Sequence, residues 1–273
     1  MRRALQATLL HLVLAAVAFV TVLPLLWMVS ASLMPAGEAT ALPPRLVPSA
    51  VTLEHYAALF RRLHLARALA NSALLAGALT LVSLLLNSLA GYAFAKLPFA
   101  GRERLFRLLL AALVIPGQVS MLPLFLMLRE LGLINTYWGV IVPGMASIFG
   151  IFLVRQYALS IPSSLLDAAR IDGAGELRIY WSLVVPFCKP ILVTLAIFTF
   201  LGSWNDFLWP LIVLTDDDLH TLPVALANLL GEHVQDVELM MAGAVLTVLP
   251  VVVVFLALQR YYIEGIMSGS LKE

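Results

Sequence analysis

The sequence predicts an all-α integral membrane protein with six transmembrane helices. Of its 273 residues, 62% are hydrophobic and only 12% are charged, and the mean hydropathy is +0.97. A soluble domain carries about 25% charged residues, so the excess apolar surface must face something other than water. The apolar residues also form six runs, most of them close to the roughly 20 helical residues that cross a hydrocarbon core. Backbone groups in lipid must be hydrogen-bonded within their own segment, so these runs are expected to be helices.

The six predicted spans follow one another along the chain. They are Leu12–Val29, Ala73–Ala95, Leu108–Leu128, Tyr137–Val154, Pro190–Leu214 and Leu239–Leu258. The first run follows Arg2 and Arg3, as in a secretory signal peptide, but it outlasts the usual core of about 7–15 residues and no small-residue cleavage site follows promptly. We therefore expect a retained helix. Pro116-Gly117 is expected to kink the third span.

The basic residues predict the orientation of the chain, because Lys and Arg concentrate on the cytoplasmic side of membrane proteins. With six spans, the face that holds both termini carries 12 Lys and Arg, and the other face carries five. Both termini are therefore expected in the cytoplasm. The segment 34–69 opposes this assignment, since it is basic and yet must lie outside.

The external segment 34–70 is expected to have two parts. Its first half contains four prolines and is expected to be irregular. The second half is expected to form an amphipathic helix along the membrane surface, because apolar residues recur there at helical spacing. These residues are Leu53, Tyr56, Ala57, Phe60 and Leu63. A structural lead-in to the second span is favoured over contact with a solute.

The loop 158–187, between the fourth and fifth spans, is longer than the usual connection of about 2–8 residues in a helix bundle. Ser160 and Pro162 are typical of a helix start, and Gly173 lies where a helix ends with a positive φ. A second helix is expected over about 175–184. The loop is therefore predicted to be a helix–Gly–helix hairpin beneath the bilayer. The apolar face of its first helix is expected to comprise Leu165, Leu166, Ala168, Ala169 and Ile171.

This hairpin carries a resemblance to a known family. Asp167-Ala168-Ala169, three residues, Gly173, nine residues and Leu183-Val184-Val185-Pro186 resemble the EAA motif of ABC importer permeases, with the same spacing throughout. The departures are Asp in place of Glu, and Leu and Val in place of Ile and Leu. Stretches such as Pro24-Leu-Leu-Trp, Ser203-Trp-Asn-Asp and the tail are similar to the carbohydrate-uptake branch, and most resemble the shorter, six-span permease of the maltose type.

The resemblance implies a type I ABC importer permease (MetI-like) fold and a binding-protein-dependent transport component of the bacterial inner membrane. The implied partners are a second permease in a heterodimer, an ABC ATPase dimer and an extracytoplasmic solute-binding protein, with a sugar as substrate. In that family the EAA hairpin is the coupling helix, which sits in a cleft of the ATPase. By this resemblance, the ATPase-docking residues are Asp167, Ala168, Ala169, Gly173, Leu183 and Pro186.

No catalytic or metal-binding signature is found in the sequence. A phosphate-binding loop ends in Gly-Lys-Ser/Thr, and no lysine of this chain follows a glycine. The histidines show no metal-ligand spacing, and there is no Gly-x-Ser-x-Gly elbow. The single Cys188 is expected to be a small buried hydrophobe. We therefore expect a chain that is not an enzyme and binds no cofactor, with ATP and Mg²⁺ held by the partner ATPase.

Asp206 is the only acidic residue within the six runs, and ionisable residues inside a membrane are usually functional. It follows Asn205 and is expected toward the outer leaflet, between Trp204 and Trp209, which are typical of interface aromatics. A hydrogen bond between helices at the membrane rim is the favoured role. The alternative is that Asn205 and Asp206 form a wall or outer gate of the sugar pathway.

Three further polar residues are candidates for the solute pathway. Asn87 and Tyr92 lie in the second span, and Gln118 lies beside the expected kink of the third. Polar side chains in spans more often join helices than bind a substrate. We expect them to be helix–helix contacts first and pathway residues second.

One domain is expected over residues 1–273. It comprises an N-terminal span (1–33), the external segment (34–70), a core bundle (71–263) that includes the hairpin (158–187), and a cytoplasmic tail (264–273). One alternative function is a secondary transporter driven by an ion gradient, which would want ionisable residues near mid-membrane and often internal repeats. A permease of the same family for a solute other than a sugar also stays open, because the EAA pattern alone does not fix the substrate.

Overall fold

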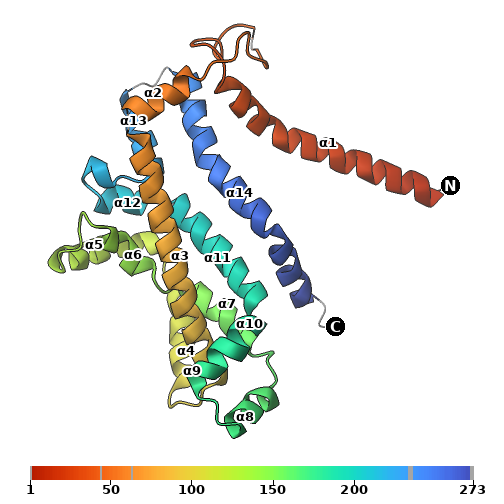
Figure 1. The fold of residues 1–273 in the computed structure, drawn as a ribbon, viewed down its shortest axis with the longest axis vertical. Helices are drawn as coiled ribbons and strands as arrows, with labels where there is room; N and C mark the ends of the chain where they lie inside the picture. The colour runs from red at the N-terminus through yellow and green to blue at the C-terminus, as the bar shows by residue number, and fades with distance from the viewer. Residues whose placement is uncertain (1, 44, 63, 233–235, 271–273) are drawn as a thin grey trace. The chain divides into compact units, whose positions relative to one another are not determined.

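A computed structural model of the chain describes residues 2–43, 45–62, 64–232 and 236–270 (Figure 1). The chain is 76% helical, and no strand occurs within those ranges, so the predicted all-α class is confirmed. The chain divides into two compact units. The first comprises Met1–Ala66 and Ala225–Pro250, and the second comprises Arg67–Val224 and Val251–Glu273.

The first unit contains α1, which carries the first predicted span. Its helices are α1 (Arg2–Ala31), α2 (Glu54–Arg62), and the parts of α13 (Leu222–Glu232) and α14 (Val237–Ser270) up to Pro250. From Gln6 to Leu26 every residue of α1 is exposed. A helix that is apolar all round is suited to lipid or to another apolar protein surface. The predicted tail continues α14 as far as Ser270, and Lys272 lies outside the described residues.

The helix predicted in the external segment forms as α2, and the residues that it buries within the protein lie outside the predicted apolar set. Leu53 and Phe60 are exposed, whereas His55 and Leu59 are buried, and Leu63 lies outside the described residues. His55 Nε2 lies 2.9 Å from the carbonyl oxygen of Met34. The irregular segment that follows α1 therefore folds back over this edge of the helix. Hydrophobic spacing alone did not reveal which edge the segment would cover.

The second unit contains the predicted hairpin and most of the predicted core bundle. Its elements are α3 (Leu65–Lys96) from Arg67 onward, α4 (Arg102–Ala112), η1 (Gly117–Ser120), α5 (Met121–Glu130), α6 (Tyr137–Gly144), α7 (Ile148–Ala158), α8 (Ser163–Ile171), α9 (Glu176–Ile179), the π-helical turn η2 (Tyr180–Val184), α10 (Val185–Phe187), α11 (Lys189–Trp204), α12 (Leu208–Val213) and η3 (Asp217–Leu219). Within this unit α7 packs against α4 and α11, and α6 packs against α12.

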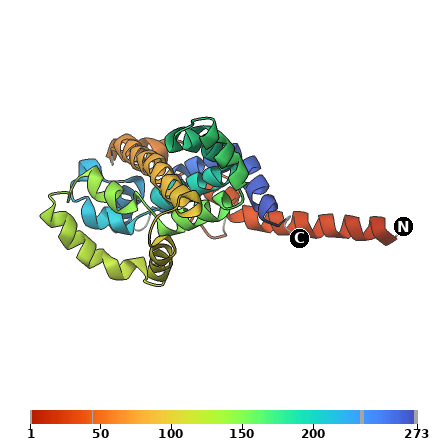
Figure 2. The same cartoon turned by 90° about the horizontal axis from the view of Figure 1, so that it is seen from below.

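Three predicted spans are continuous helices, and the other three are broken. In the described residues, α1, α3 and α14 are each long and apolar enough to cross a membrane. The third predicted span bends by 95° between α4 and the η1–α5 segment, at residues 113–116. Figure 2 shows that these two segments run in different directions. The fourth bends by 41° between α6 and α7. Six spans result if each bent pair counts as one.

The fifth predicted span, Pro190–Leu214, is wrong as a single helix. Helix α11 ends at Trp204, and α12 begins only at Leu208. At the other end, the segment Glu176–Phe187 meets α11 with a bend of 80°. The apolar run conceals the break after Trp204, because composition reports which residues avoid water and not where the helix axis changes direction.

Close packing of α6 gives a test of the fold. A Cβ added at Gly139 would lie 2.4 Å from the carbonyl oxygen of Leu133 and 2.7 Å from Val213 Cγ1. We expect Gly139→Ala to lower the stability of the protein in detergent by about 1–3 kcal/mol, measured by thermal unfolding. Gly144→Ala is the control, because its Cβ meets the end of the flexible Leu79 side chain. Equal melting temperatures for the two variants would contradict the packing.

Candidate functional site

The predicted hairpin forms between α7 and α11, with a turn closed by backbone hydrogen bonds. Gly173 has a φ of +81°, the left-handed conformation predicted for it. The Ala174 N–H donates to the Ala169 carbonyl at 2.9 Å, and the Gly173 N–H donates to the Arg170 carbonyl at 3.0 Å. This pair of bonds is the Schellman motif, which satisfies the last carbonyls of a helix. The turn is therefore determined locally, by the glycine and the end of α8.

The prediction that Ser160 caps the first hairpin helix is wrong. The Ser160 hydroxyl donates to the Tyr157 carbonyl at 2.7 Å, so it belongs to the end of α7. Helix α8 begins after Pro162, which takes the N-cap position without a side-chain hydrogen bond. Pro162 suits this position because its φ is already fixed and it has no N–H to satisfy.

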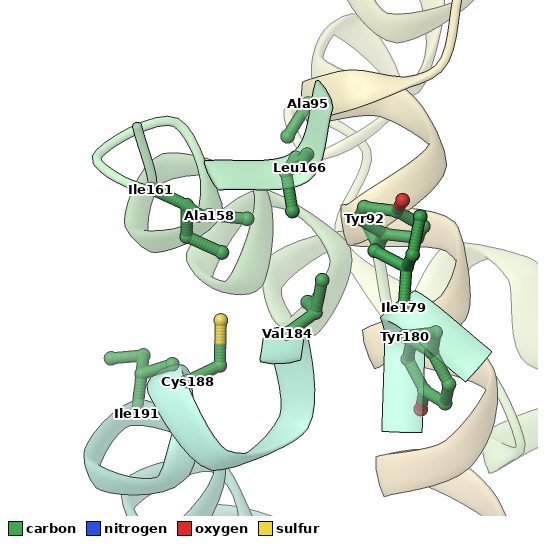
Figure 3. Packing of buried hydrophobic residues seen from close by; sticks show 10 residues of the cluster. All are labelled: Tyr92, Ala95, Ala158, Ile161, Leu166, Ile179, Tyr180, Val184, Cys188 and Ile191. Carbon is green, nitrogen blue, oxygen red and sulfur yellow. The ribbon is translucent and has the colours of Figure 1, made fainter. Parts of the chain in front are cut away.

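An apolar cluster anchors the hairpin to the rest of the second unit (Figure 3). It gathers buried side chains from α3, α7, the hairpin and α11: Tyr92, Ala95, Ala158, Ile161, Leu166, Ile179, Tyr180, Val184, Cys188 and Ile191. Cys188 is buried within this cluster, as predicted. Ala169 and Leu183 pack against it from the hairpin. The side of the hairpin that faces the protein is thus a compact core.

Ion pairs join the two helices of the hairpin. The Arg170 guanidinium bonds Asp167 Oδ1 through Nη1 and Glu176 Oε1 through Nε, each at 2.8 Å. The hydrogen bond to Glu176, followed by that to Asp167, raises the pKa of Arg170 above its already high value. The other Glu176 oxygen accepts a hydrogen bond from the Tyr92 hydroxyl at 2.6 Å. Asp167 and Arg170 show the i, i+3 spacing of helix ion pairs, but no sequence pattern marks Glu176 as the partner that Arg170 and Tyr92 share.

The outward side of the hairpin exposes apolar residues near its turn. Asp167, Ala168, Gly173 and Pro186 are exposed, whereas Ala169 and Leu183 are half-buried. The predicted apolar face of α8 divides in two, since Leu166 is buried whereas Ile171 is 86% exposed and Leu165 is also exposed. Leu177 and Trp181 add further exposed apolar surface. Apolar side chains gathered on a loop are typical of a surface that contacts another protein.

The second arm of the hairpin is not a uniform helix. The Val185 N–H donates to the Tyr180 carbonyl, five residues earlier, which makes η2 a π-helical turn. Pro186 follows within α10 and lacks the N–H that a regular helix would use. The bend of 80° into α11 comes directly after it. Turns of this kind occur often at functional sites.

A groove elsewhere in the second unit brings together two of the predicted pathway residues. Gln118 and Asp206 both line a cavity of about 360 Å³. Its other lining residues are Leu79, Gly117, Met121, Leu124, Val140, Pro143, Gly144, Ser203 and Trp209. A mostly apolar wall with a few converging polar groups is typical of small-molecule sites. Ser203 and Trp209 were not assigned to a pathway from the sequence.

Asp206 lies in the break between α11 and α12, where its Oδ1 accepts a hydrogen bond from the Trp209 N–H at 3.3 Å. Trp204 and Trp209 are buried rather than exposed at an interface. The Trp209 indole donates to the Gly139 carbonyl at 3.1 Å. The neighbouring Asn205 is exposed, and its amide donates to the Leu201 carbonyl.

Asn87 and Tyr92 lie apart from the groove. Asn87 is fully buried, and its side chain accepts from the Ser147 N–H at 2.9 Å and donates to Ser83 Oγ at 2.7 Å. It thus joins α3 to the start of α7, which is the structural role favoured from the sequence. Tyr92 lies beneath the hairpin, bonded to Glu176. Within the described residues, no group of His, Cys, Asp and Glu is arranged to hold a metal ion.

Comparison with known families gives one match over most of the chain. Residues 85–267 match the family described as binding-protein-dependent transport system inner membrane component. An arabinooligosaccharide transport system permease protein of Halalkalibacterium halodurans is 40% identical over 261 residues, which cover 94% of each chain. A lactose transport system permease protein of Rhizobium radiobacter is 32% identical, over 100% of this chain and 98% of its own.

A solved structure shares the fold. It is the crystal structure of a bacterial ABC transporter involved in the import of the acidic polysaccharide alginate, and one of its chains superimposes with a TM-score of 0.83. The sequence identity is 24%, and the match covers 95% of this chain and 97% of that one. The predicted permease fold is thereby confirmed.

Proposed function

This chain belongs to the family of binding-protein-dependent transport system inner membrane components, and on that premise we propose that it carries a sugar or sugar derivative across the inner membrane. It is a transport permease and not an enzyme. The relatives that import arabinooligosaccharides and lactose support a sugar as the solute. Energy for import comes from ATP hydrolysis by a partner subunit, since the sequence has no phosphate-binding loop.

The hairpin is the surface that docks the ATPase. The observation that carries this proposal is the exposed turn of the hairpin, where Ile171 is 86% and Leu177 71% exposed beside Gly173. The inward side chains of the hairpin pack in the apolar cluster or form the ion pairs. The exposed residues at the turn are therefore accessible to a partner protein. Ala168 and Gly173 have side chains small enough to let a cleft of the ATPase approach the backbone.

The groove beside α12 is the part of the solute pathway that this chain contributes. The Asp206 carboxylate and the Gln118 amide offer hydrogen bonds that match sugar hydroxyls. Trp209 is fixed by its own hydrogen bonds, and its ring supplies an apolar surface for the C–H face of a sugar. Both roles rest on the placement of these residues on one groove of about 360 Å³.

The complete importer contains a second permease, two ATPase subunits and an extracytoplasmic solute-binding protein. The exposed and mostly apolar α1 supports contact with lipid or with the second permease. The excess of Lys and Arg in the loops on one side, 12 against five, supports cytoplasmic termini.

Affinity purification of the tagged chain from its native membrane in mild detergent tests this function. We expect an ABC ATPase and a second permease to copurify, and the reconstituted complex to take up sugar only with ATP and the binding protein. Uptake by the chain alone, driven by an ion gradient, would instead establish a secondary transporter.

A further inference from the structure

Three polar side chains recur along one face of α3 and contact the hairpin region. Ser88, Tyr92 and Lys96 are spaced four residues apart, so they lie on the same face of the helix. We call these three residues the α3 ladder. Two of them are buried, Ser88 at 4% and Tyr92 at 3% exposed. The sequence placed Tyr92 in the second predicted span and gave no sign of its contact with the hairpin.

Each residue of the ladder bonds a different segment of the hairpin. The Ser88 and Tyr180 hydroxyls lie 2.6 Å apart, which joins α3 to the π-helical turn. The Tyr92 hydroxyl donates to Glu176 Oε2 at the start of α9, at 2.6 Å. These two bonds fix the π-helical turn and the second helix of the hairpin to α3. A third bond, from Lys96, fixes the segment that enters the hairpin.

That third bond is made by Lys96 at the end of α3. Its ammonium donates to the Ile161 carbonyl at 2.6 Å and to the Leu159 carbonyl at 3.3 Å. These carbonyls follow α7, where a helix end leaves backbone acceptors without intrahelical partners. A cation there also interacts favourably with the helix dipole.

Glu176 connects the ladder to the outer part of the hairpin. One of its oxygens holds Tyr92 and the other holds Arg170, which in turn holds Asp167. A continuous chain of hydrogen bonds therefore runs from the first residue of the motif, across both hairpin helices, to α3. Hydrogen bonds to ionised groups are directional and roughly twice as strong as neutral ones. Apolar contacts, in contrast, are not directional and permit sliding.

The covalent route from the hairpin to α11 is not one continuous helix. After α9 the chain passes through the π-helical turn and bends by 80° before α11. A displacement of the hairpin that passes along the backbone to α11 must therefore cross an irregular turn and a bend. The path through the α3 ladder has bonds of 2.6 Å at three points along the helix.

We propose that the α3 ladder makes the hairpin and the C-terminal half of α3 move as one body, so that α3 receives the displacement imposed by the ATPase. Tyr92 and Glu176 act as positioning residues in this link. The inference rests on the proposed docking of the ATPase at the hairpin. Beyond that docking, the inference names α3 as the helix that receives the movement, and the α3 ladder as the side chains that transmit it.

The test compares Tyr92→Phe, Glu176→Ala and the double variant in the complete transporter, reconstituted with its ATPase, second permease and binding protein. Sugar uptake and ATP hydrolysis are measured on the same proteoliposomes, together with the amount of assembled complex. We expect each single variant to lower uptake per ATP by about three- to tenfold, with assembly unchanged. The double variant should be no worse than Glu176→Ala, because both changes break one link. Tyr157→Phe, which removes a hydroxyl outside the ladder, is the control and should couple normally.

Normal uptake per ATP in Tyr92→Phe would overturn the proposal while the docking of the ATPase still stood. Loss of uptake and hydrolysis in proportion to a loss of assembled complex would also overturn it, since the residues would then only support folding. A wild-type chain that assembles with no ATPase would refute the proposed function itself, and copurification of the wild type reports that before any variant is made.

Discussion

Replacing Gly173 with tryptophan is expected to lower ATP-driven sugar uptake by more than about tenfold while the chain still inserts in the membrane. Gly173 has a φ of +81°, and a Cβ built on it meets no atom within 4 Å. The new side chain therefore projects away from its own chain, toward the surface that we assign to the ATPase. The backbone strain costs about 1–2 kcal/mol, which is too little to explain a complete loss. Uptake and copurification of the ATPase are the measurements.

A matched control is available at Gly101. It has a φ of +79° and equally open surroundings, but it lies in the loop before α4, outside the docking surface. Gly101→Trp should therefore show the same backbone strain with nearly normal uptake. Gly173→Asn adds a second control, because Asn tolerates this conformation better than other side chains. Normal uptake in Gly173→Trp would refute the docking assignment.

Asp206→Ala is expected to lower sugar uptake at low sugar concentration by about ten- to hundredfold without any effect on copurification of the ATPase. The loss of one charged hydrogen-bonding group from the groove is worth about 1.5–3 kcal/mol of solute binding, so the change should appear first as a higher KM for uptake. The measurement is uptake by the reconstituted complex over a range of sugar concentrations.

Asp206 also holds the Trp209 N–H at 3.3 Å, so a second variant must separate the two roles. Asp206→Asn keeps an oxygen for that N–H, and its melting temperature should match the wild type. We expect its uptake to lie between that of the wild type and that of Asp206→Ala, since an amide still bonds hydroxyls. A stability defect in Asp206→Ala, together with wild-type uptake in Asp206→Asn, would assign the residue to helix capping alone.

Much of the hairpin was predictable because its determinants are local. The glycine that takes a positive φ, the proline before α8 and the apolar spacing of its helices all act within a few residues of each other. The partner of Arg170 was not predictable in the same way. Asp167 is three residues away on the same helix, but Glu176 lies beyond the turn, and only the path of the turn brings its carboxylate to Nε.

The candidate pathway residues also separate into what the sequence predicted and what only the tertiary structure showed. From the sequence, Asn87, Tyr92 and Gln118 were equivalent polar groups within apolar runs, and only Asp206 stood out, as the one acidic residue. The structure places Gln118 and Asp206 on one groove, Asn87 between α3 and α7, and Tyr92 beneath the hairpin. Composition detects that each polar group needs a partner, but it does not say whether the partner is protein or solute.

The sequence by itself determined that this protein is an all-helical membrane protein with a helix–Gly–helix loop, because apolar run length and turn residues are properties of the chain in order. Its resemblance to the EAA motif indicated the permease family. The tertiary structure decided where the fifth span breaks, which face of α2 is buried, and that α3 holds the hairpin. These depend on contacts between segments far apart in the sequence. Ser88 and Tyr180, 92 positions apart, illustrate this, since no local pattern marks either hydroxyl as the partner of the other.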